Sequence, residues 1–318
     1  MRNVKLGWKE WTKWQKRPGQ PYDIFLMSMS NVNCPATILT WILHSFRGKV
    51  VFISGESESE YGLGTMRNDG LKYTLGPVPK EGPQAMPLTY LQMTWWAVFR
   101  PLYDTNHNPN SEEADQVLVD LAHKPKNDDQ HFLIYSASNC VGFRQEAFDQ
   151  LSTIGLVHYG GKCRGRDTGD SSNNNKTGFT NGVSLRNWWD NVEHVYHHFR
   201  FCLVMEHVSQ VNYITEKILM AFLGGCIPIY YGSEKILDIF NPQAFVFYNV
   251  TSPTSALDRI RYLELNRTAY WEVLRHQPIL ADDNVLRRYF SFDDNVGDGH
   301  LKQKIRHMLE LDRYEFVP

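Results

Sequence analysis

Three short polar segments carry the side chains best suited to chemistry, and each follows an apolar, strand-like run. The first, Tyr213-Ile214-Thr215-Glu216-Lys217, combines hydroxyl, carboxylate and ammonium groups and precedes a helical pattern. If Thr215 starts that helix, Glu216 and Lys217 lie in its first turn. Lys217 could then neutralise a diphosphate, and Glu216 could accept hydrogen bonds from ribose hydroxyls. We predict an anion site of the kind that nucleotide-dependent α/β enzymes use. The alternative is an ordinary surface helix start with a solvated Glu–Lys pair.

The second segment is Ser54-Gly55-Glu56-Ser57-Glu58, which follows the apolar run Lys49–Ile53. A carboxylate just beyond the carboxyl end of a parallel strand points to the edge where α/β enzymes bind ligands. Glu56 is therefore a candidate general base. The alternative is a solvated acidic loop, because Glu58 and Glu60 lie close by in the sequence.

The third segment is Ser138-Asn139-Cys140, followed by Arg144. It also lies between an apolar run and a helical pattern. Arg144 could hold a diphosphate through the fork of N–H donors that a lysine lacks. The alternative is a surface arginine on an amphipathic helix.

Several other kinds of site have no matching motif. The chain has no GxGxxG turn and no GxxxxGK[ST] loop, which argues against nicotinamide and Walker-type phosphate sites. It has no DxD triplet for a metal–nucleotide pair, no GxSxG and no catalytic-cysteine signature. His194, His197 and His198 lack partners at zinc spacing, so satisfied or solvated histidines are the better interpretation.

The composition sets the protein class. With 318 residues, 42% hydrophobic residues and a net charge of −2, the chain can form one large or two ordinary domains and has no global field favouring nucleic acid. No apolar run approaches membrane-span length and no leader pattern is visible, so we expect no integral membrane segment. The five cysteines are widely spaced and include no CxxC pair, and two of them lie in apolar strand-like runs, where a reduced buried thiol is the usual interpretation. This favours a reducing compartment and a cytoplasmic location, or a Golgi lumen if an anchor was trimmed.

The elements that must position these segments alternate along the chain, which predicts parallel sheets. The polar run from 123 to 130 is the best candidate for a domain boundary. The run from Gly76 to Pro87 and the one from Asp167 to Gly182 are predicted loops. Strands are expected at Asp23–Ser28, Lys49–Gly55, His131–Ser136, Leu156–Tyr159, Phe201–Met205, Ile227–Tyr231 and Phe245–Tyr248. Helices are expected at Thr37–Phe46, from Glu112, and at Gln145–Thr153, Thr215–Leu223, Ala256–Leu263, Ala269–Arg275 and Leu301–Leu311.

The run from Phe201 to Phe245 resembles the donor-site signature of the α1,3/4-fucosyltransferases, glycosyltransferase family ten. In that family a strand ending in Phe-Glu-Asn precedes a Tyr-(Ile or Val)-Thr-Glu-Lys segment, a helix, a small-residue turn and a strand like Ile-Pro-Ile-Tyr-Trp-Gly-Ser. The corresponding residues here are Met205-Glu206-His207, Tyr213 to Lys217, Gly224-Gly225, Ile227 to Ser233 and Phe240 to Phe245. Weaker matches at Val51 to Glu58, at Ser138-Asn139 with Arg144, and at Tyr159 to Cys163 extend the resemblance from about residue 50 to 280.

The resemblance implies an α/β fold of the GT-B type, with two Rossmann-like domains facing across a cleft. Residues 1–125 would bind the acceptor, 126–300 would bind the GDP-sugar, and 301–318 would form a helix packing back on the first domain. The implied reaction is inverting transfer of L-fucose from GDP-β-L-fucose to a hydroxyl of an oligosaccharide, with O3 of GlcNAc or Glc as the expected position. No metal would be required for the chemistry, although Mn²⁺ or Mg²⁺ could stimulate it.

The resemblance also implies roles for individual residues. Glu56 would take the proton from the attacking hydroxyl, while Arg144 and Lys217 would stabilise the negative charge on the departing GDP. Glu216 and Tyr213 would hold the ribose and the sugar. The remaining donor-binding positions would be Ser138, Asn139, His207, Ile214 and Thr215.

One departure from the family keeps two alternatives open. His207 stands where the family has the asparagine that faces the donor. The chain could therefore be a GT-B transferase for another nucleotide sugar, or a degenerate member that binds glycan or nucleotide without turnover. Retention of Glu56, Arg144, Glu216 and Lys217 together argues against the second of these.

Overall fold

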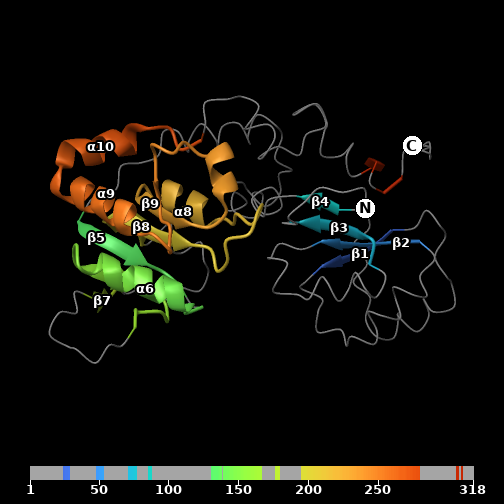
Figure 1. Cartoon of the computed structure of the whole chain (residues 1–318), viewed down its shortest axis with the longest axis horizontal. Helices are drawn as coiled ribbons and strands as arrows, with labels where there is room; N and C mark the ends of the chain where they lie inside the picture. Colours follow the sequence, from blue (N-terminus) through green and yellow to red (C-terminus); the bar gives the residue numbers. More distant parts are fainter. Residues whose placement is uncertain are drawn as a thin grey trace, which may run out of the picture. The chain divides into compact units, whose positions relative to one another are not determined.

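The computed structural model divides the chain into two compact units, 1–88 with 299–318, and 89–298 (Figure 1). The residues that it describes are 24–28, 48–53, 71–76, 85–87, 130–137, 139–166, 176–179, 195–279, 306–307 and 309–310. The predicted domain limits stay predictions, because 88–129 and 280–305 lie outside the described residues. Glu56, Ser138, the predicted helix at Thr37–Phe46 and the one from Glu112 lie outside them as well, as does most of the expected final helix, of which 306–307 are helical.

The first unit contains a four-stranded parallel sheet in the order β1-β2-β3-β4. Strands β1 (Ile24–Ser28) and β2 (Lys49–Ile53) confirm the sequence prediction. Strand β3 (Tyr73–Gly76) was not predicted, and β4 (Ala85–Pro87) lies in the run from Gly76 to Pro87 that was predicted to be loop. All four β3 residues are buried between strands, and β4 is an edge strand, where a terminal proline is tolerated.

The second unit is built on a six-stranded parallel sheet with the order β7-β6-β5-β8-β9-β10. Strands β5, β6 and β7 therefore follow one another toward one edge of the sheet. The chain then crosses back to the other side of β5, where β8, β9 and β10 follow one another toward the opposite edge. The strands are β5 (His131–Tyr135), β6 (Val157–Tyr159), β7 (Lys176–Gly178), β8 (Phe199–Met205), β9 (Ile227–Tyr231) and β10 (Val246–Phe247). The central strands are continuous apolar runs because both of their faces are covered.

Two apolar clusters cover this sheet, and the alternation of side chains along β8 separates them. Phe201, Leu203 and Met205 belong to the cluster that contains the buried residues of three helices, α6 (Gly142–Leu151), α9 (Thr254–Leu265) and α10 (Arg267–Arg275). Cys202 and Val204 belong to the other cluster, with α8 (Lys217–Leu223) and the 3₁₀ helices η5 (Tyr196–His198) and η6 (Glu234–Asp238).

Two predictions about local structure are wrong in ways that matter for the site. Helix α8 begins at Lys217 rather than at Thr215, so the segment before it is a loop with Glu216 at the N-cap. Strand β7 lies inside the predicted polar loop from Asp167 to Gly182, where its composition conceals it. It is an edge strand, and its Lys176 is ion-paired with Asp149 of α6, so charge at this position is tolerated.

The cysteines also differ from the prediction. Cys140 is bonded to Cys163 and Cys202 to Cys226, with Cα atoms 5.2 and 5.8 Å apart. The interpretation of the two cysteines in apolar strand-like runs as reduced buried thiols is therefore wrong. The separations of 23 and 24 residues gave no signal, because the pairing depends on which strands and loops become neighbours. Cys34 lies outside the described residues.

Candidate functional site

The strand order places a topological switch point at the carboxyl ends of β5 and β8. These strands are neighbours, but β5 leads into α6 on one face of the sheet, whereas β8 leads to α8 on the other. In open α/β sheets, ligands bind outside the strand ends at such a switch point. The loop after β5 is the predicted Ser138-Asn139 segment, and the loop after β8 leads into the predicted Tyr213 to Lys217 segment. The structure thus brings two of the three predicted segments to one edge, while Glu56 lies outside the described residues.

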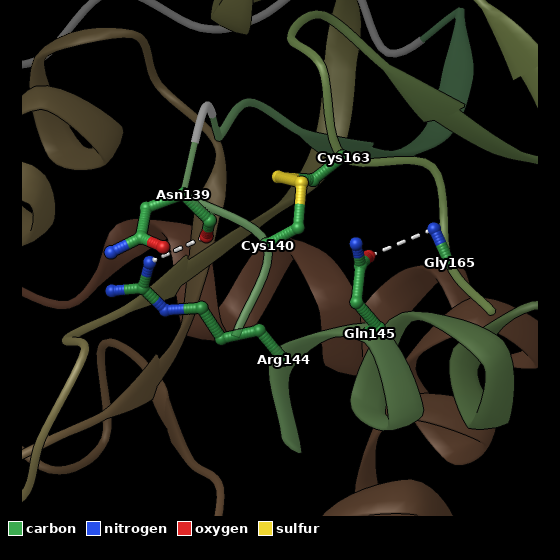
Figure 2. Close-up of a disulfide and its surroundings, with 6 residues drawn as sticks. All are labelled: Asn139, Cys140, Arg144, Gln145, Cys163 and Gly165. Carbon is green, nitrogen blue, oxygen red and sulfur yellow. Dashed lines mark hydrogen bonds between the residues drawn. A yellow bond between two sulfur atoms is a disulfide. The ribbon is translucent and has the colours of Figure 1, made fainter. Parts of the chain in front are cut away.

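The Arg144 side chain of α6 hydrogen-bonds both to the loop after β5 and to the residues at the end of β8. Its Nη2 donates to Met205 O at 2.6 Å, its Nε to Glu206 O at 3.3 Å, and its Nη1 to Asn139 O at 3.3 Å, the last visible in Figure 2. The side chain is buried, so the alternative of a surface arginine is wrong. Burial lowers the pKa of the guanidinium, although Tyr135 and Glu206 oppose the shift. A guanidinium has further N–H donors, so these three bonds leave capacity for an anion.

Glu206 organises the loop after β8. It is fully buried, and its Oε1 accepts hydrogen bonds from Thr215 N at 2.7 Å and from Thr215 Oγ1 at 2.8 Å. Its Oε2 lies 3.1 Å from the Lys217 ammonium, which also donates to Thr215 Oγ1 at 2.8 Å. The carboxylate at the end of β8 therefore holds both the hydroxyl and the cation of the predicted anion site.

The Lys217 side chain still reaches solvent, because 34% of it is exposed. Burial alone would lower the pKa of its ammonium group. The carboxylates of Glu206 and Glu216 outweigh that effect and raise the pKa above its ordinary value. Lys217 is thus fully cationic at neutral pH. It is a half-buried, anchored cation rather than the solvated one that the alternative interpretation required.

His207 and Tyr213 form a second pair beside this network. The Tyr213 hydroxyl lies 3.1 Å from His207 Nδ1, and the two rings meet edge to face with centroids 4.9 Å apart. Tyr213 is buried and His207 half-buried. Ile214, a predicted donor-binding position, is fully buried in the core with Ile218 of α8, so its side chain serves packing. Glu216 is half-buried at the N-cap of α8.

The close packing around Glu206 explains why the residue directly after β9, Gly232, is a glycine. A Cβ at Gly232 would lie 2.3 Å from the Tyr230 hydroxyl and 2.7 Å from Glu206 Cγ. The backbone N–H of Glu206 also donates to Tyr231 O at 2.7 Å, and Ser209 Oγ donates to Gly232 O at 2.9 Å. Only glycine allows the turn after β9 to approach this near.

Glu206 is the site residue to which the sequence patterns gave no role. Its signal was present, because it is the acidic residue directly after an unbroken apolar strand, where an unpaired carboxylate would be costly. Within the described residues, no group of three or more His, Cys, Asp or Glu side chains is placed to hold a metal ion. None of the helices in that part of the chain is long and apolar enough to cross a membrane.

Comparison with known proteins gives consistent results. Residues 125–291 match the model of glycosyltransferase family 10 (fucosyltransferase), C-terminal part. An α-(1,3)-fucosyltransferase from Helicobacter pylori is 33% identical over 161 residues, which are 50% of this chain and 30% of that protein. An α-(1,4)-fucosyltransferase from Arabidopsis thaliana is 24% identical over 133 residues, covering 38% of this chain and 31% of the relative. The matches thus span less than a third of these curated relatives.

Solved structures extend the likeness to nearly the whole chain. A crystal structure of α1,3-fucosyltransferase has a TM-score of 0.61 at 22% identity, covering 96% of this chain and 88% of the other. A structure of α1,3-fucosyltransferase with GDP-fucose has a TM-score of 0.55 at 21% identity, covering 92% of each chain. At this identity the likeness shows the fold alone. It confirms the predicted α/β class of the GT-B type.

Proposed function

Because this chain belongs to glycosyltransferase family 10, the fucosyltransferases, we propose that it transfers L-fucose from GDP-β-L-fucose to a hydroxyl of an oligosaccharide, with inversion. O3 of GlcNAc or Glc is the proposed position. The observation that carries the proposal is the network at the switch point. There Glu206 fixes Thr215 and Lys217 at the end of β8, while Arg144 ties that strand end to the loop after β5.

The proposed roles follow from charge. As the bond to fucose breaks, negative charge grows on the departing GDP, and Lys217 with Arg144 would stabilise it. Ser138 and Asn139 would border the diphosphate, while Tyr213, His207 and Glu216 would contact the ribose or the sugar. Glu56 is the proposed general base for the acceptor hydroxyl. A divalent cation is proposed only as a stimulant.

The two disulfides change the expected location. Disulfides form and persist in oxidising compartments and are rare in the cytosol. Cys140–Cys163 and Cys202–Cys226 therefore support a proposal that the chain folds in an oxidising compartment, in place of the cytoplasmic prediction.

The first experiment compares nucleotides by thermal unfolding and then tests transfer. A ligand at 100 times its dissociation constant stabilises the folded state by about 2.7 kcal/mol. We expect GDP to raise the melting temperature, whereas UDP, ADP and CMP at the same concentration do not. A glycan array with GDP-fucose then identifies the acceptor. A shift with UDP and none with GDP would contradict the proposed donor.

Lys217→Ala tests the donor site directly. Loss of this cation should weaken GDP binding and reduce turnover roughly 100-fold or more, the usual cost of losing such a charge contact. Lys235→Ala is the matched control, because Lys235 is an exposed lysine whose partner is Asp238 in the same 3₁₀ helix. Equal GDP affinity in both variants would remove Lys217 from the phosphate site.

Glu56→Gln tests the proposed base. The change keeps the side-chain size but removes the proton acceptor, so GDP affinity should survive while transfer falls by orders of magnitude. Normal turnover in this variant would direct attention to Glu58.

His207 supports one alternative donor. Its ring is held by Tyr213 at the position where the family has asparagine. Transfer from another nucleotide sugar would then be the activity. His207→Asn separates the two cases, because it should raise GDP affinity only if the histidine has altered donor choice.

A further inference from the structure

The segment that follows β6, Gly160–Arg166, is fastened to the β5–α6 connection at several points. Cys163 is bonded to Cys140, and its backbone N–H donates to Ala137 O at 3.1 Å. Gly165 N donates to Gln145 Oε1 at 2.8 Å, as Figure 2 shows. We call Gly160–Arg166 the clamp segment.

The end of the clamp segment also binds side chains of α6. Arg166 N donates to Asp149 Oδ2 at 3.0 Å, and the Arg166 guanidinium pairs with Glu146 at 2.9 Å. Gln145 and Glu146 each lie about one turn before Asp149, so the clamp segment contacts the middle of this helix. The disulfide is the covalent member of a set of contacts with one helix and the loop before it.

The place of Cys140 in the loop gives the disulfide its importance. Cys140 directly follows Asn139, whose carbonyl oxygen accepts the Arg144 Nη1 hydrogen bond at 3.3 Å. The same loop begins at the carboxyl end of β5, beside the switch point. Its backbone is thus fixed at one end by the strand, at its middle by Arg144, and next to that by the disulfide (Figure 2).

We propose that the Cys140–Cys163 disulfide is a positioning element of the donor site, which holds the β5–α6 loop where it receives the diphosphate of the nucleotide sugar. This role rests on the proposed function and goes beyond a contribution to stability. Misplacement of a binding loop by about 1 Å can cost roughly 100-fold in rate. A covalent link beside Asn139 prevents that displacement of the loop. Hydrogen bonds alone, at an edge that faces solvent, would resist it less well.

The second disulfide provides a matched control within the same unit. Cys202 and Cys226 are both fully buried in the cluster under α8, and they join β8 to the start of β9. The separations of 23 and 24 residues are nearly equal, so the two links constrain the unfolded chain to the same extent. The two disulfides should therefore contribute equally to stability through the unfolded state. Only Cys140–Cys163 includes a residue of the β5–α6 loop.

The test compares Cys140→Ala/Cys163→Ala with Cys202→Ala/Cys226→Ala. Both double variants should melt at lower temperature. Only the first should raise the KM for GDP-fucose and the dissociation constant of GDP, by roughly 10- to 100-fold. A donor KM raised equally in both, or in neither, at a temperature where both are folded, overturns the proposal.

A second readout does not depend on the reaction. Amide hydrogen exchange of the ligand-free protein should be faster at 137–144 in the first variant and unchanged there in the second. If the wild-type protein neither binds GDP nor transfers fucose, the proposed function fails, and exchange still reports whether the disulfide positions the loop. Unchanged exchange at 137–144 in the first variant overturns the positioning role by itself.

Mild reduction replaces the first variant if that variant does not fold. Cys140 is exposed, whereas Cys202 and Cys226 are fully buried, so dithiothreitol should reach the first disulfide first, giving two thiols and oxidised dithiothreitol. Alkylation and mass spectrometry identify the reduced pair. Donor KM should rise in step with reduction of Cys140–Cys163, and a KM that stays constant through complete reduction of this pair overturns the proposal.

Discussion

Glu206 is completely buried, and its two carboxylate oxygens have three donors around them, one of which is an ammonium group. Removing one member of a buried charged pair leaves the other without compensation and typically costs about 3–5 kcal/mol. Glu206→Ala should therefore lower the free energy of unfolding by about 3 kcal/mol, measured by urea denaturation. Lys217 reaches solvent, which places the expected cost at the lower limit.

The control for this prediction is Glu234→Ala, a change at an exposed glutamate just beyond β9. It should alter the free energy of unfolding by no more than about 0.5 kcal/mol, as exposed substitutions usually do. If the two variants were equally stable, Glu206 would have no organising role in the loop.

His158 is a second residue with a measurable signature. It is 5% exposed in β6, and its ring lies 4.7 Å from that of His131 and 5.1 Å from that of Phe199. Burial, and secondly the neighbouring His131 imidazole, lower its pKa from 6.5 to about 4. Below pH 6.5 the unfolded chain binds a proton that the folded protein does not. Stability should therefore fall between pH 6.5 and 4, by about 3 kcal/mol at most.

Urea unfolding of His158→Phe at pH 7 and pH 4.5 tests this. The variant should lose much less stability than the wild type between the two pH values, because its ring does not titrate. His307→Gln, at an exposed histidine, should keep the full wild-type dependence. Identical pH profiles for the wild type and His158→Phe would contradict the assignment.

At the scale of elements, apolar runs predicted most of the framework. The runs at His131–Ser136 and Phe201–Met205 became β5 and β8, because a buried parallel strand must be apolar on both faces. The polar β7 and the three-residue β4 were missed, because neither contains an apolar run long enough to indicate a strand. The strand order, and with it the switch point, could not be predicted from periodicity, because it depends on crossovers between distant segments.

The candidate site was also predicted only in part, because residue types indicate single segments but not the contacts between them. The Tyr213 to Lys217 segment and Arg144 were identified from residue types, and both lie at the switch point. Their contacts could not be predicted, because Glu206 meets Thr215 only after the loop folds back, and Arg144 meets Met205 across 61 positions of sequence. The start of α8 at Lys217 was missed, because Thr215 lies in the preceding loop, where it donates to the Glu206 carboxylate.

Two glycines around the β5–α6 connection give an element-scale prediction. A Cβ at Gly161 of the clamp segment would lie 2.2 Å from the Ala137 carbonyl oxygen, a backbone atom that cannot move aside cheaply. Gly161→Ala should therefore separate the two loops and cost about 1–3 kcal/mol of stability. Gly142→Ala, at the first residue of α6 with nothing within 4 Å, should be neutral or stabilise by up to about 1 kcal/mol.

Thermal unfolding of both variants measures the contrast. The melting temperature should fall for Gly161→Ala and stay or rise for Gly142→Ala. GDP affinity should fall with Gly161→Ala as well, if the clamp segment positions the donor loop. Equal melting temperatures would mean that the loops tolerate a wider separation than the contact with Ala137 implies.

At the scale of the whole molecule, the chain consists of two compact units, each with its own parallel sheet. The family model covers 125–291, within the second unit, whereas the likeness to solved structures covers 96% of the chain. The proposed donor-binding residues that the structure describes, from Asn139 to Lys217, all belong to the second unit. A nucleotide should therefore act mainly on one of the two units.

Hydrogen exchange of the intact protein with and without GDP tests whether the nucleotide binds to the second unit. At 100 times its dissociation constant, GDP should slow exchange that requires unfolding of the second unit by about 100-fold. The strongest protection should fall at 136–144 and 206–217, because these loops border the switch point. Strands β1, β2 and β3 should change much less, and UDP at equal concentration serves as the control. Protection centred on β1–β3, with none at 206–217, would place the nucleotide in the first unit and overturn the assignment of the donor site.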